Sequence, residues 1–474
     1  MLANHIGGER LFCRSPREIT MKIIVVGCGK IGKTIVASLV KERHDVLVID
    51  NDPKVVTSVT DSYDVMGICG NGTSYDKLEE AGVATAELFI AVTNSDELNM
   101  LSCFAAKRLG AKHTVARIRS SEYNTKSLGF MKDSLELSLV INPELLTAEA
   151  LYNVLKLPSA TKVETFSGGA FEMAEIIVKQ GSQLDGITMI ELRKKIKEHF
   201  LISAVQRGKN VYIPNGLFRL HNGDKIGITA TGDDMNNLLK DLGILHKQAR
   251  DVMILGAGEI TYYLAKRLIA DRTAVKVIER NEDRCNEFCE LVDKAFVING
   301  DGMNQEVLME EGIDTTDAFV ALSGNDETNI LISSYANTRE VPKIITKVNR
   351  RELTPIAEKL GLDCLMSPKT IIADTLVRYA RALQNSLGSN VETLYSLMNG
   401  GAEALEFNVA ADFPKLGTPL KDIKLKPGIL IAGISRGYNA FIPGGDDCIE
   451  LGDKVIVIAA GQKLYDLKDI LKIG

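Results

Sequence analysis

The strongest constraint on this 474-residue chain is that it repeats itself with a period of about 229 residues. The segment KIIVVGCGKIG at residues 22–32 returns as DVMILGAGEI at 251–260, so that Gly256 lies 229 positions after Gly27. Two later motifs, GNGTSYDKLEEAG and AVTNSDELN, return 230 positions further on as GDGMNQEVLMEEG and ALSGNDETN. The chain is therefore a tandem duplication, and both halves are expected to share one architecture.

Each half also carries a second, different part. LISAVQRGKNVYIPNG, which begins at residue 201, returns as LIAGISRGYNAFIPGG from residue 430. Three pairs of residues keep the offset of 229: Arg207 and Arg436, Pro214 and Pro443, Asp224 and Asp453. Short apolar runs with Gly-Asp and Pro-x-Gly turns predict a small α+β module. The expected order is N lobe, C lobe, N lobe, C lobe.

The first glycine-rich segment has the spacing of a dinucleotide-binding turn. Residues 22–26 are apolar and β-branched, as in a strand buried on both faces of a parallel sheet. Gly27 permits the tight turn, Gly29 lets a pyrophosphate approach the backbone, and Gly32 lets the following helix pack closely on the strand. The free amides at that helix N-terminus would then face the phosphates.

A second apolar run, HDVLVIDND at residues 44–52, places Asp50 at its end, 23 positions after Gly27. An acidic side chain there accepts hydrogen bonds from ribose hydroxyls and repels a 2′-phosphate. Glu279 occupies the same place in the second half. A simpler reading stays open, in which the glycines only make a βα turn and Asp50 caps the next helix.

Strand and helix patterns alternate through the first N lobe, which predicts a parallel, doubly wound α/β sheet. The expected strands are 22–27, 45–50, 64–69, 87–92 and 114–118, and the expected helices are 30–43, 53–62, 73–81 and 96–109. An apolar helix then leaves the sheet in each half. From its periodicity alone, packing against a partner subunit and packing within its own domain are both open.

The repeat suggests seven segments. These are an extension expected to be disordered (1–20), a first Rossmann-like domain (21–142), a crossover helix (143–160), a first C domain (161–246), a second Rossmann-like domain (250–367), a second crossover helix (368–388) and a second C domain (391–474). The two units and the extension account for the whole chain, which leaves no room for a separate catalytic domain.

Composition excludes several functional classes. The net charge of −6 argues against a broad nucleic-acid surface, and no apolar run approaches the roughly 18 residues that cross a bilayer. The eight cysteines lack CxxC spacing and the six histidines lack ligand spacing, so no metal site is expected. The sequence has no GxxxxGK[ST] loop and no GxSxG elbow. Binding without catalysis is the better account, and no catalytic residue is assigned.

Five motifs in their order, GCGKIG, VIDND, GNGT, AVTNSDELNMLSC and ARIRSSEY, resemble the TrkA family over residues 21–474. These are peripheral subunits of Trk potassium uptake systems with two RCK (regulator of potassium conductance) units. The resemblance implies a tetramer whose N lobes form a gating ring under a TrkH- or TrkG-type channel. It implies a cytoplasmic protein at the inner face of the membrane that binds NAD(H) and ATP or ADP.

The resemblance also implies two nucleotide sites. The first would use Gly27, Cys28, Gly29, Lys30, Ile31, Gly32, Asp50, Asn51, Asn71, Gly72, Thr93, Asn94, Arg117 and Arg119. The second would use Gly256, Gly258, Glu259, Ile260, Glu279, Arg280 and Asp301. The two arginines of the first site would reach toward phosphate, either within their own subunit or across a subunit interface. The alternative is that they lie on a solvated face, since alternate residues of a strand share one side.

The second site departs from the pattern in three places. Thr261 replaces Gly32 and, being β-branched, is expected to crowd the contact between helix and strand. Gly324 replaces Asn94, and Lys347 replaces Arg117. The second site is therefore expected to be altered, weaker or selective for another nucleotide. Three alternatives remain: a sensor acting on another transporter, a cyclic-dinucleotide receptor through the C lobes, and an NAD-dependent oxidoreductase.

Overall fold

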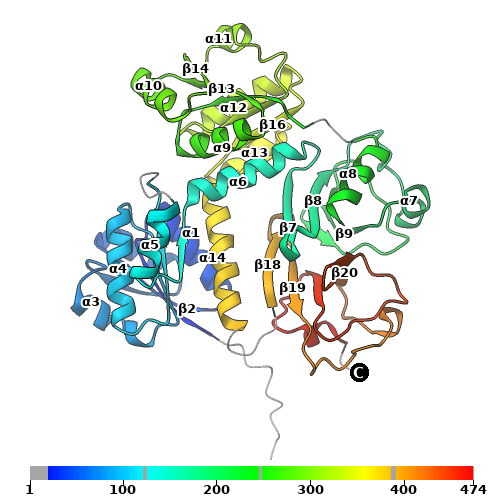
Figure 1. Cartoon of the computed structure of the whole chain (residues 1–474), viewed down its shortest axis with the longest axis horizontal. Coiled ribbons are helices and arrows are strands. Elements are labelled where there is room, and N and C mark those ends of the chain that lie inside the picture. Colours follow the sequence, from blue (N-terminus) through cyan, green and yellow to red (C-terminus); the bar gives the residue numbers. More distant parts are fainter. Residues whose placement is uncertain (1–19, 121–124, 245–247, 386–390, 473–474) are drawn as a thin grey trace, which may run out of the picture.

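The computed structural model of the protein describes residues 20–120, 125–244, 248–385 and 391–472. Four sheets follow one another along the chain, two parallel and two antiparallel. Figure 1 shows two Rossmann-like lobes at the top and left of the molecule and the two C lobes together at the right. The alternation confirms the predicted fold class. The extension expected at residues 1–20 lies, up to residue 19, outside the described residues.

The first N lobe is a six-stranded parallel sheet in the order β3-β2-β1-β4-β5-β6. Its strands are β1 (Lys22–Val26), β2 (Asp45–Asp50), β3 (Met66–Cys69), β4 (Leu88–Ala91), β5 (His113–Arg117) and β6 (Leu139–Ile141). Its helices are α1 (Lys30–Lys41), α2 (Pro53–Ser62), α3 (Tyr75–Glu80), α4 (Asp96–Arg108) and α5 (Thr125–Ser134). The chain reverses its direction across the sheet between β1 and β4, where open α/β sheets form a ligand crevice.

The second N lobe repeats this order as β14-β13-β12-β15-β16-β17. Its strands are β12 (Asp251–Leu255), β13 (Ala274–Glu279), β14 (Phe296–Asn299), β15 (Ala318–Ala321), β16 (Lys343–Lys347) and β17 (Leu365–Met366). Its helices are α9 (Glu259–Ala270), α10 (Glu282–Leu291), α11 (Gln305–Glu310), α12 (Asp326–Thr338) and α13 (Thr354–Lys359).

Each C lobe is a five-stranded antiparallel sheet. The first contains β7 (Lys162–Phe166), β8 (Phe171–Ile177), β9 (Phe200–Arg207), β10 (Asn210–Tyr212) and β11 (Lys225–Ala230), with α7 (Met189–Lys195) and α8 (Gly232–Asp241). The second contains β18 (Val391–Leu397), β19 (Ala402–Asn408), β20 (Ile429–Arg436), β21 (Asn439–Phe441) and β22 (Lys454–Ala460).

The repeated Arg and Asp residues of the C lobes form one internal ion pair in each lobe. Arg207 donates from Nε and Nη2 to the two carboxylate oxygens of Asp224, both at 2.7 Å, and Arg436 meets Asp453 in the same way at 2.9 Å. Both aspartates are 1% exposed. A buried carboxylate needs such a partner, so these residues are repeated because they hold each C lobe together.

The two crossover helices are exchanged between the halves. Helix α6 (Pro143–Lys156) packs against α9 of the second N lobe, and α14 (Pro368–Asn385) packs against α1 of the first, as Figure 1 shows. Leu151 of α6 shares a core with Leu264 of α9, and Leu376 of α14 shares a core with Leu39 of α1. Neither open reading had included this arrangement, in which each helix packs on the N lobe of the other half. The partner is the other half of the same chain.

The two C lobes also pack on each other through a shared apolar core that includes Phe166, Phe171 and Ile456. Two buried glutamates cross this interface symmetrically. Glu175 accepts a hydrogen bond from the Met398 amide at 2.9 Å, and Glu406 accepts one from the Ser167 hydroxyl. The halves are thus related as in a dimer whose two subunits are joined into one chain.

A buried ion cluster ties the first N lobe to α14 and the second C lobe. The guanidinium of Arg381, 3% exposed, donates to Glu42 at 2.6 Å and to Glu403 at 3.0 and 3.1 Å. Lys463 donates to the other Glu42 oxygen at 2.8 Å. Burial opposes the charge on Glu42, but Arg381 and Lys463 outweigh it, so the pKa of this carboxyl is lowered.

Shortening a buried side chain of the exchanged helix α14 should destabilise the whole protein. Leu376 is fully buried between α14 and α1, so Leu376→Ala should lower the free energy of unfolding by about 2–5 kcal/mol. Leu145→Ala is the control, because this α6 residue is 39% exposed. Urea denaturation gives both values. Equal, small losses in the two variants would contradict the exchanged packing.

His44, beside the ion cluster, predicts a pH dependence. Its side chain is 7% exposed, and burial lowers its pKa from 6.5 to about 4. The unfolded chain therefore binds a proton between these values while the folded chain does not, so stability should fall as pH drops from about 6.5 toward 4, by on the order of 3 kcal/mol.

The variant that checks this is His44→Thr, because threonine is the counterpart in the second half, where Thr273 is buried. We expect the free energy of unfolding of this variant, measured by urea titration at several pH values, to depend much less on pH than that of the unmodified protein. His199→Thr, at an exposed position, is the control and should keep the pH dependence. If the free energy of unfolding of His44→Thr depends on pH as strongly as that of the unmodified protein, a group other than His44 causes the pH dependence.

Candidate functional site

The turn after β1 is built so that only glycine fits at two positions. Gly27 has φ = +91°, and a Cβ there would lie 2.8 Å from the Thr93 amide nitrogen. A Cβ on Gly32 would lie 2.0 Å from the Gly27 carbonyl oxygen. Gly29, the residue preceding α1, is different, because a Cβ there would meet nothing within 4 Å. The backbone of Gly29 therefore borders open space at the start of the helix.

The carboxylate of Asp50 lies directly against this turn. Its Oδ2 accepts from the Cys28 amide at 2.6 Å, and its Oδ1 accepts from the Asp52 amide at 3.0 Å. The helix cap is Asp52, whose side chain accepts from the Lys54 amide at 2.8 Å, so the reading of Asp50 as the cap was wrong. Each carboxylate oxygen retains capacity for another donor, as a ribose contact requires.

The thiol of Cys28 is fully buried, and burial followed by the nearby Asp50 charge raises its pKa to about 12. Cys28 thus contributes its backbone to the turn and no reactive sulfur. Lys30 and Ile31 form the first turn of α1, and Asn51 is exposed beside Asp50.

The loops after β3 and β4 close the same edge of the sheet. Gly72 is buried where a Cβ would lie 2.3 Å from Val26 Cγ1, and the side chain of Asn71 accepts from the Thr73 amide at 3.0 Å. Thr93 donates from its amide and its hydroxyl to Asn99, both at 2.7 Å, and Asn94 is exposed.

Two residues of this edge were not predicted from the sequence. Buried Asn99 also donates to the carbonyl of Arg117 at 2.9 Å, which joins the β4 loop to the end of β5. Asp96 accepts from the amides of Arg119 and Ser120, both at 2.8 Å. Asn329 and Asp326 do the same in the second half. Their exact recurrence in the repeated motif is the signal that could have identified them.

The two arginines lie in different surroundings. Arg117 is 6% exposed, with Nη2 3.6 Å from the Glu144 carboxylate of α6, and its Nε has no hydrogen-bond partner among the described residues. Arg119 is partly exposed and donates to the Asn94 carbonyl at 2.6 Å. The prediction of a solvated face was therefore wrong for Arg117.

The second half of the chain also contacts this edge of the first N lobe, because the Tyr263 hydroxyl of α9 donates to the Arg119 carbonyl at 3.4 Å.

The second lobe repeats the geometry with substitutions. Glu279 accepts from the amides of Ala257 and Asn281, each at 3.0 Å, as Asp50 does in the first lobe. Gly256 has φ = +100°, Gly258 precedes α9, and Ile260 lies in its first turn. Two further predicted residues, Arg280 and Asp301, are exposed near the strand ends.

Thr261 does not crowd the second turn as expected. Its hydroxyl donates to the Gly256 carbonyl at 2.6 Å, so the β-branched side chain is accommodated by a hydrogen bond. The turn is also less tight, because a Cβ on Gly256 would be 3.1 Å from the nearest atom of Ser323. Lys347 directs its Nζ to the Leu322 carbonyl at 2.9 Å.

The charges at the two helix starts are opposite. Lys30 begins α1, and its charge acts on Lys369 at the start of α14, whose pKa is lowered by burial and then by Lys30. Glu259 begins α9, and its pKa is raised by burial and then by the carboxylates of Glu144 and Glu287. The first turn therefore begins beside two lysines, whereas the second begins beside carboxylates, with the charges of Arg119 and Arg284 also acting on Glu259.

Within the described ranges, no three or more His, Cys, Asp or Glu side chains form a metal-binding group. Among the same residues, no helix combines the length and apolarity that a membrane span requires.

The fold and its turns define a protein with two Rossmann-like lobes of dinucleotide-binding geometry, each followed by a small C lobe. Family models agree with this division: the TrkA-N domain matches residues 23–143 and 252–368, and the TrkA-C domain matches 173–243 and 404–472. The chain belongs to the TrkA family.

Two relatives illustrate the match. The Trk system potassium uptake protein TrkA homolog of Archaeoglobus fulgidus is 32% identical over 452 residues, which cover 95% of this chain and 100% of that protein. The Trk system potassium uptake protein TrkA of Vibrio alginolyticus is 31% identical over 449 residues, which cover 94% and 96%.

The fold is also similar to solved structures of lower sequence identity. The GsuK channel aligns with a TM-score of 0.62 at 17% identity, covering 94% of this chain and 78% of that one. The separate GsuK RCK domain aligns with a TM-score of 0.61 at 17% identity, covering 94% of both chains. These similarities extend through all four lobes.

Proposed function

We propose that this protein is a regulatory subunit of a Trk-type potassium uptake system that senses nucleotides in its N lobes and is not an enzyme. The proposal rests on the backbone of Gly29, which borders open space next to the Asp50 carboxylate at the crevice of the first N lobe. The crossover helix α14 of the other half packs on this lobe. A ligand that reshapes this turn acts on α1, and α1 packs on α14.

We infer that the ligands are NAD(H) and ATP or ADP. The GsuK channel has been solved bound to NAD and, separately, to ADP, in folds similar to this one. The residues proposed to contact nucleotide are those named from the sequence in both lobes. The first lobe is proposed as the stronger site, because Lys30 and Lys369 attract phosphate there while Glu259 at the start of α9 opposes it in the second.

The proposed assembly is a tetramer on the cytoplasmic face of the membrane, attached to a TrkH- or TrkG-like channel subunit. The family name and the similarity to an RCK-bearing channel support this partner. The domain bounds given by the repeat are part of the proposal: 21–142, 161–246, 250–367 and 391–474, with crossover helices at 143–160 and 368–388. Positions 121–124, 245, 246, 386–388, 473 and 474 within these bounds lie outside the described residues.

Matched glycine variants test the site. Gly29→Val should abolish high-affinity nucleotide binding, because a branched side chain fills the space at the start of α1. Gly258→Val, the same change in the second lobe, should leave the high-affinity site intact. Asp50→Ala should weaken binding by about 1–3 kcal/mol through loss of ribose hydrogen bonds. Calorimetry with ATP, ADP and NADH measures all three, and unchanged affinity in both Gly29→Val and Asp50→Ala would reject the site.

Coupling to the channel is tested through Arg119 and Arg117. The γ-phosphate distinguishes ATP from ADP, and a ligand shifts gating only by its difference in affinity between the two ring states. Arg119→Asn and Arg117→Lys introduce the residues of the second half, Asn349 and Lys347, and should reduce the difference between ATP and ADP in channel activity more than they reduce ADP affinity.

The measurement is rubidium flux into vesicles containing the cognate channel, beside calorimetry on the isolated subunit. Arg108→Ala, at an exposed arginine of α4, is the control and should behave as the unmodified protein does. If both arginine variants still distinguish ATP from ADP fully, these side chains do not sense the γ-phosphate.

A further inference from the structure

A cavity of about 190 Å³ lies between the first C lobe and the second N lobe, away from both glycine turns. One wall comes from the segments around β7 and β8, including Thr161 and Lys179. The other comes from the segments that begin β16 and β17, including Lys343 and Asp363. These are the amino ends of the parallel strands, so the cavity is on the edge of the sheet opposite the nucleotide crevice.

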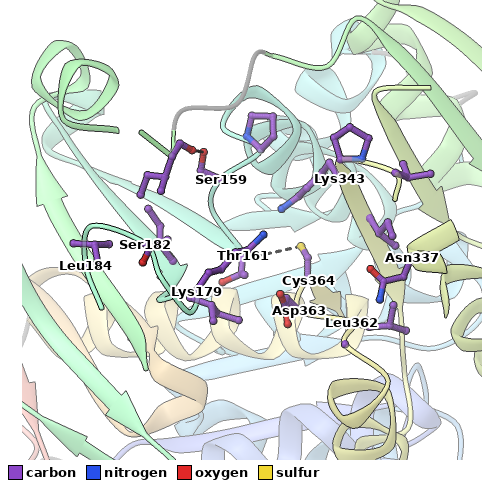
Figure 2. A pocket seen from close by; sticks show the side chains of 18 residues that line it. Ser159, Thr161, Lys179, Ser182, Leu184, Asn337, Lys343, Leu362, Asp363 and Cys364 are labelled. Carbon is purple, nitrogen blue, oxygen red and sulfur yellow. Dashed lines mark hydrogen bonds between the residues drawn. The ribbon is translucent and has the colours of Figure 1, made fainter. Parts of the chain in front are cut away.

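Lys343 is the central group of this cavity. Its side chain is 6% exposed, and its Nζ donates to the Ala160 carbonyl at 2.6 Å. No carboxylate among the described residues forms an ion pair with it. An ammonium group has three donors, and burial, together with the charge of Lys179, lowers the pKa of Lys343, a shift that an anion in the cavity would oppose. Figure 2 shows Lys343 and Lys179 pointing into the same space from opposite walls.

The cavity carries an excess of positive charge. Desolvation raises the pKa of Asp363, although the charges of Lys179, Lys343 and Lys225 oppose this. Two lysines, Lys179 and Lys343, line the cavity together with this one carboxylate. Cys364 is buried, and burial raises the pKa of its thiol, which donates to the Thr161 carbonyl at 3.3 Å, so it contributes no negative charge. The Oγ of Ser182, which also lines the cavity, has no partner among the described residues.

The other half of the chain shows that the fold does not require these charges. By strand register, Lys343 corresponds to His113, Lys179 to Ala410 and Asp363 to Ser138. The same junction between a C lobe and an N lobe is therefore built without a lysine at either position. The lysines belong to one junction only, as expected of a site with a specific ligand.

We propose that this cavity binds a small phosphate-type anion between Lys343 and Lys179. The volume is below the roughly 300–1,000 Å³ of pockets for larger ligands, which limits the occupant to a few heavy atoms. Lysine binds phosphate as a point charge, whereas planar carboxylates suit the fork of arginine. A bound anion neutralises Lys343 and joins the first C lobe to the second N lobe, independently of nucleotide.

Calorimetry on the full chain tests this, with inorganic phosphate and glycerol phosphate as probes at constant ionic strength. Saturable binding of inorganic phosphate alone indicates a free ion as the ligand, and binding of both indicates that a phosphate ester also fits. Either result supports the site if Lys179→Ala weakens binding by about ten- to hundredfold. Lys179 is exposed, so this variant is expected to fold, and alanine is its counterpart in the second half.

Lys343→Met should cause a similar loss, while Lys209→Ala, at an exposed lysine of the same C lobe, should bind as the unmodified protein does. Gly29→Val should also bind phosphate normally, which separates this cavity from the nucleotide site. The proposal is overturned if neither probe saturates, if Lys179→Ala binds as tightly as the unmodified protein, or if succinate binds as well as phosphate.

Discussion

The structure depends on the exchange of α6 and α14 between the halves. Each helix leaves its own sheet and buries its apolar face on the other half's N lobe, where Leu151 and Leu376 are fully enclosed. The Arg381 cluster then fixes α14 to the first N lobe and the second C lobe. A half without its partner would expose the apolar faces of these helices to water, so each half needs the other for a complete core. Because α1 and α9 follow the glycine turns and pack on the exchanged helices, each turn is in contact, through its helix, with a segment of the other half.

The duplication has preserved geometry more faithfully than charge. The acidic residue against the turn, the buried asparagine after the fourth strand and the aspartate that holds the fifth-strand loop recur with the same hydrogen bonds. Yet Lys30 is the first residue of α1, and Glu259 is the first residue of α9. The backbone framework is needed for folding in both halves, while the charged side chains at its edge are free to differ. The two lobes therefore have one fold and opposite charges at the start of the helix that follows the glycine turn.

Much of the site was predictable because its residues act through the backbone. Gly27 and Gly32 are dictated by a positive φ and a close contact, and both constraints leave a spacing that is visible in the sequence. Asn99 and Asp96 were missed because a polar residue in the first turn of a helix is typical of the surface. Only the folded structure shows these side chains bonded to the end of β5 and to the loop after it, 18 to 24 positions away. Thr261 was misjudged because a hydroxyl can donate where a methyl would clash.

The sequence by itself determined the duplication, the four lobes, the parallel sheets and the glycine turns, because these follow from local periodicity and from residue types that only certain backbones accept. The tertiary structure alone decided where the crossover helices pack, which carboxylates contact Arg381, and that Lys343 is a buried lysine facing a cavity. An amphipathic helix specifies that one face must be covered and does not specify by what. The partner is fixed by the three-dimensional arrangement of segments more than 100 residues apart in the sequence, such as those of Leu39 and Leu376.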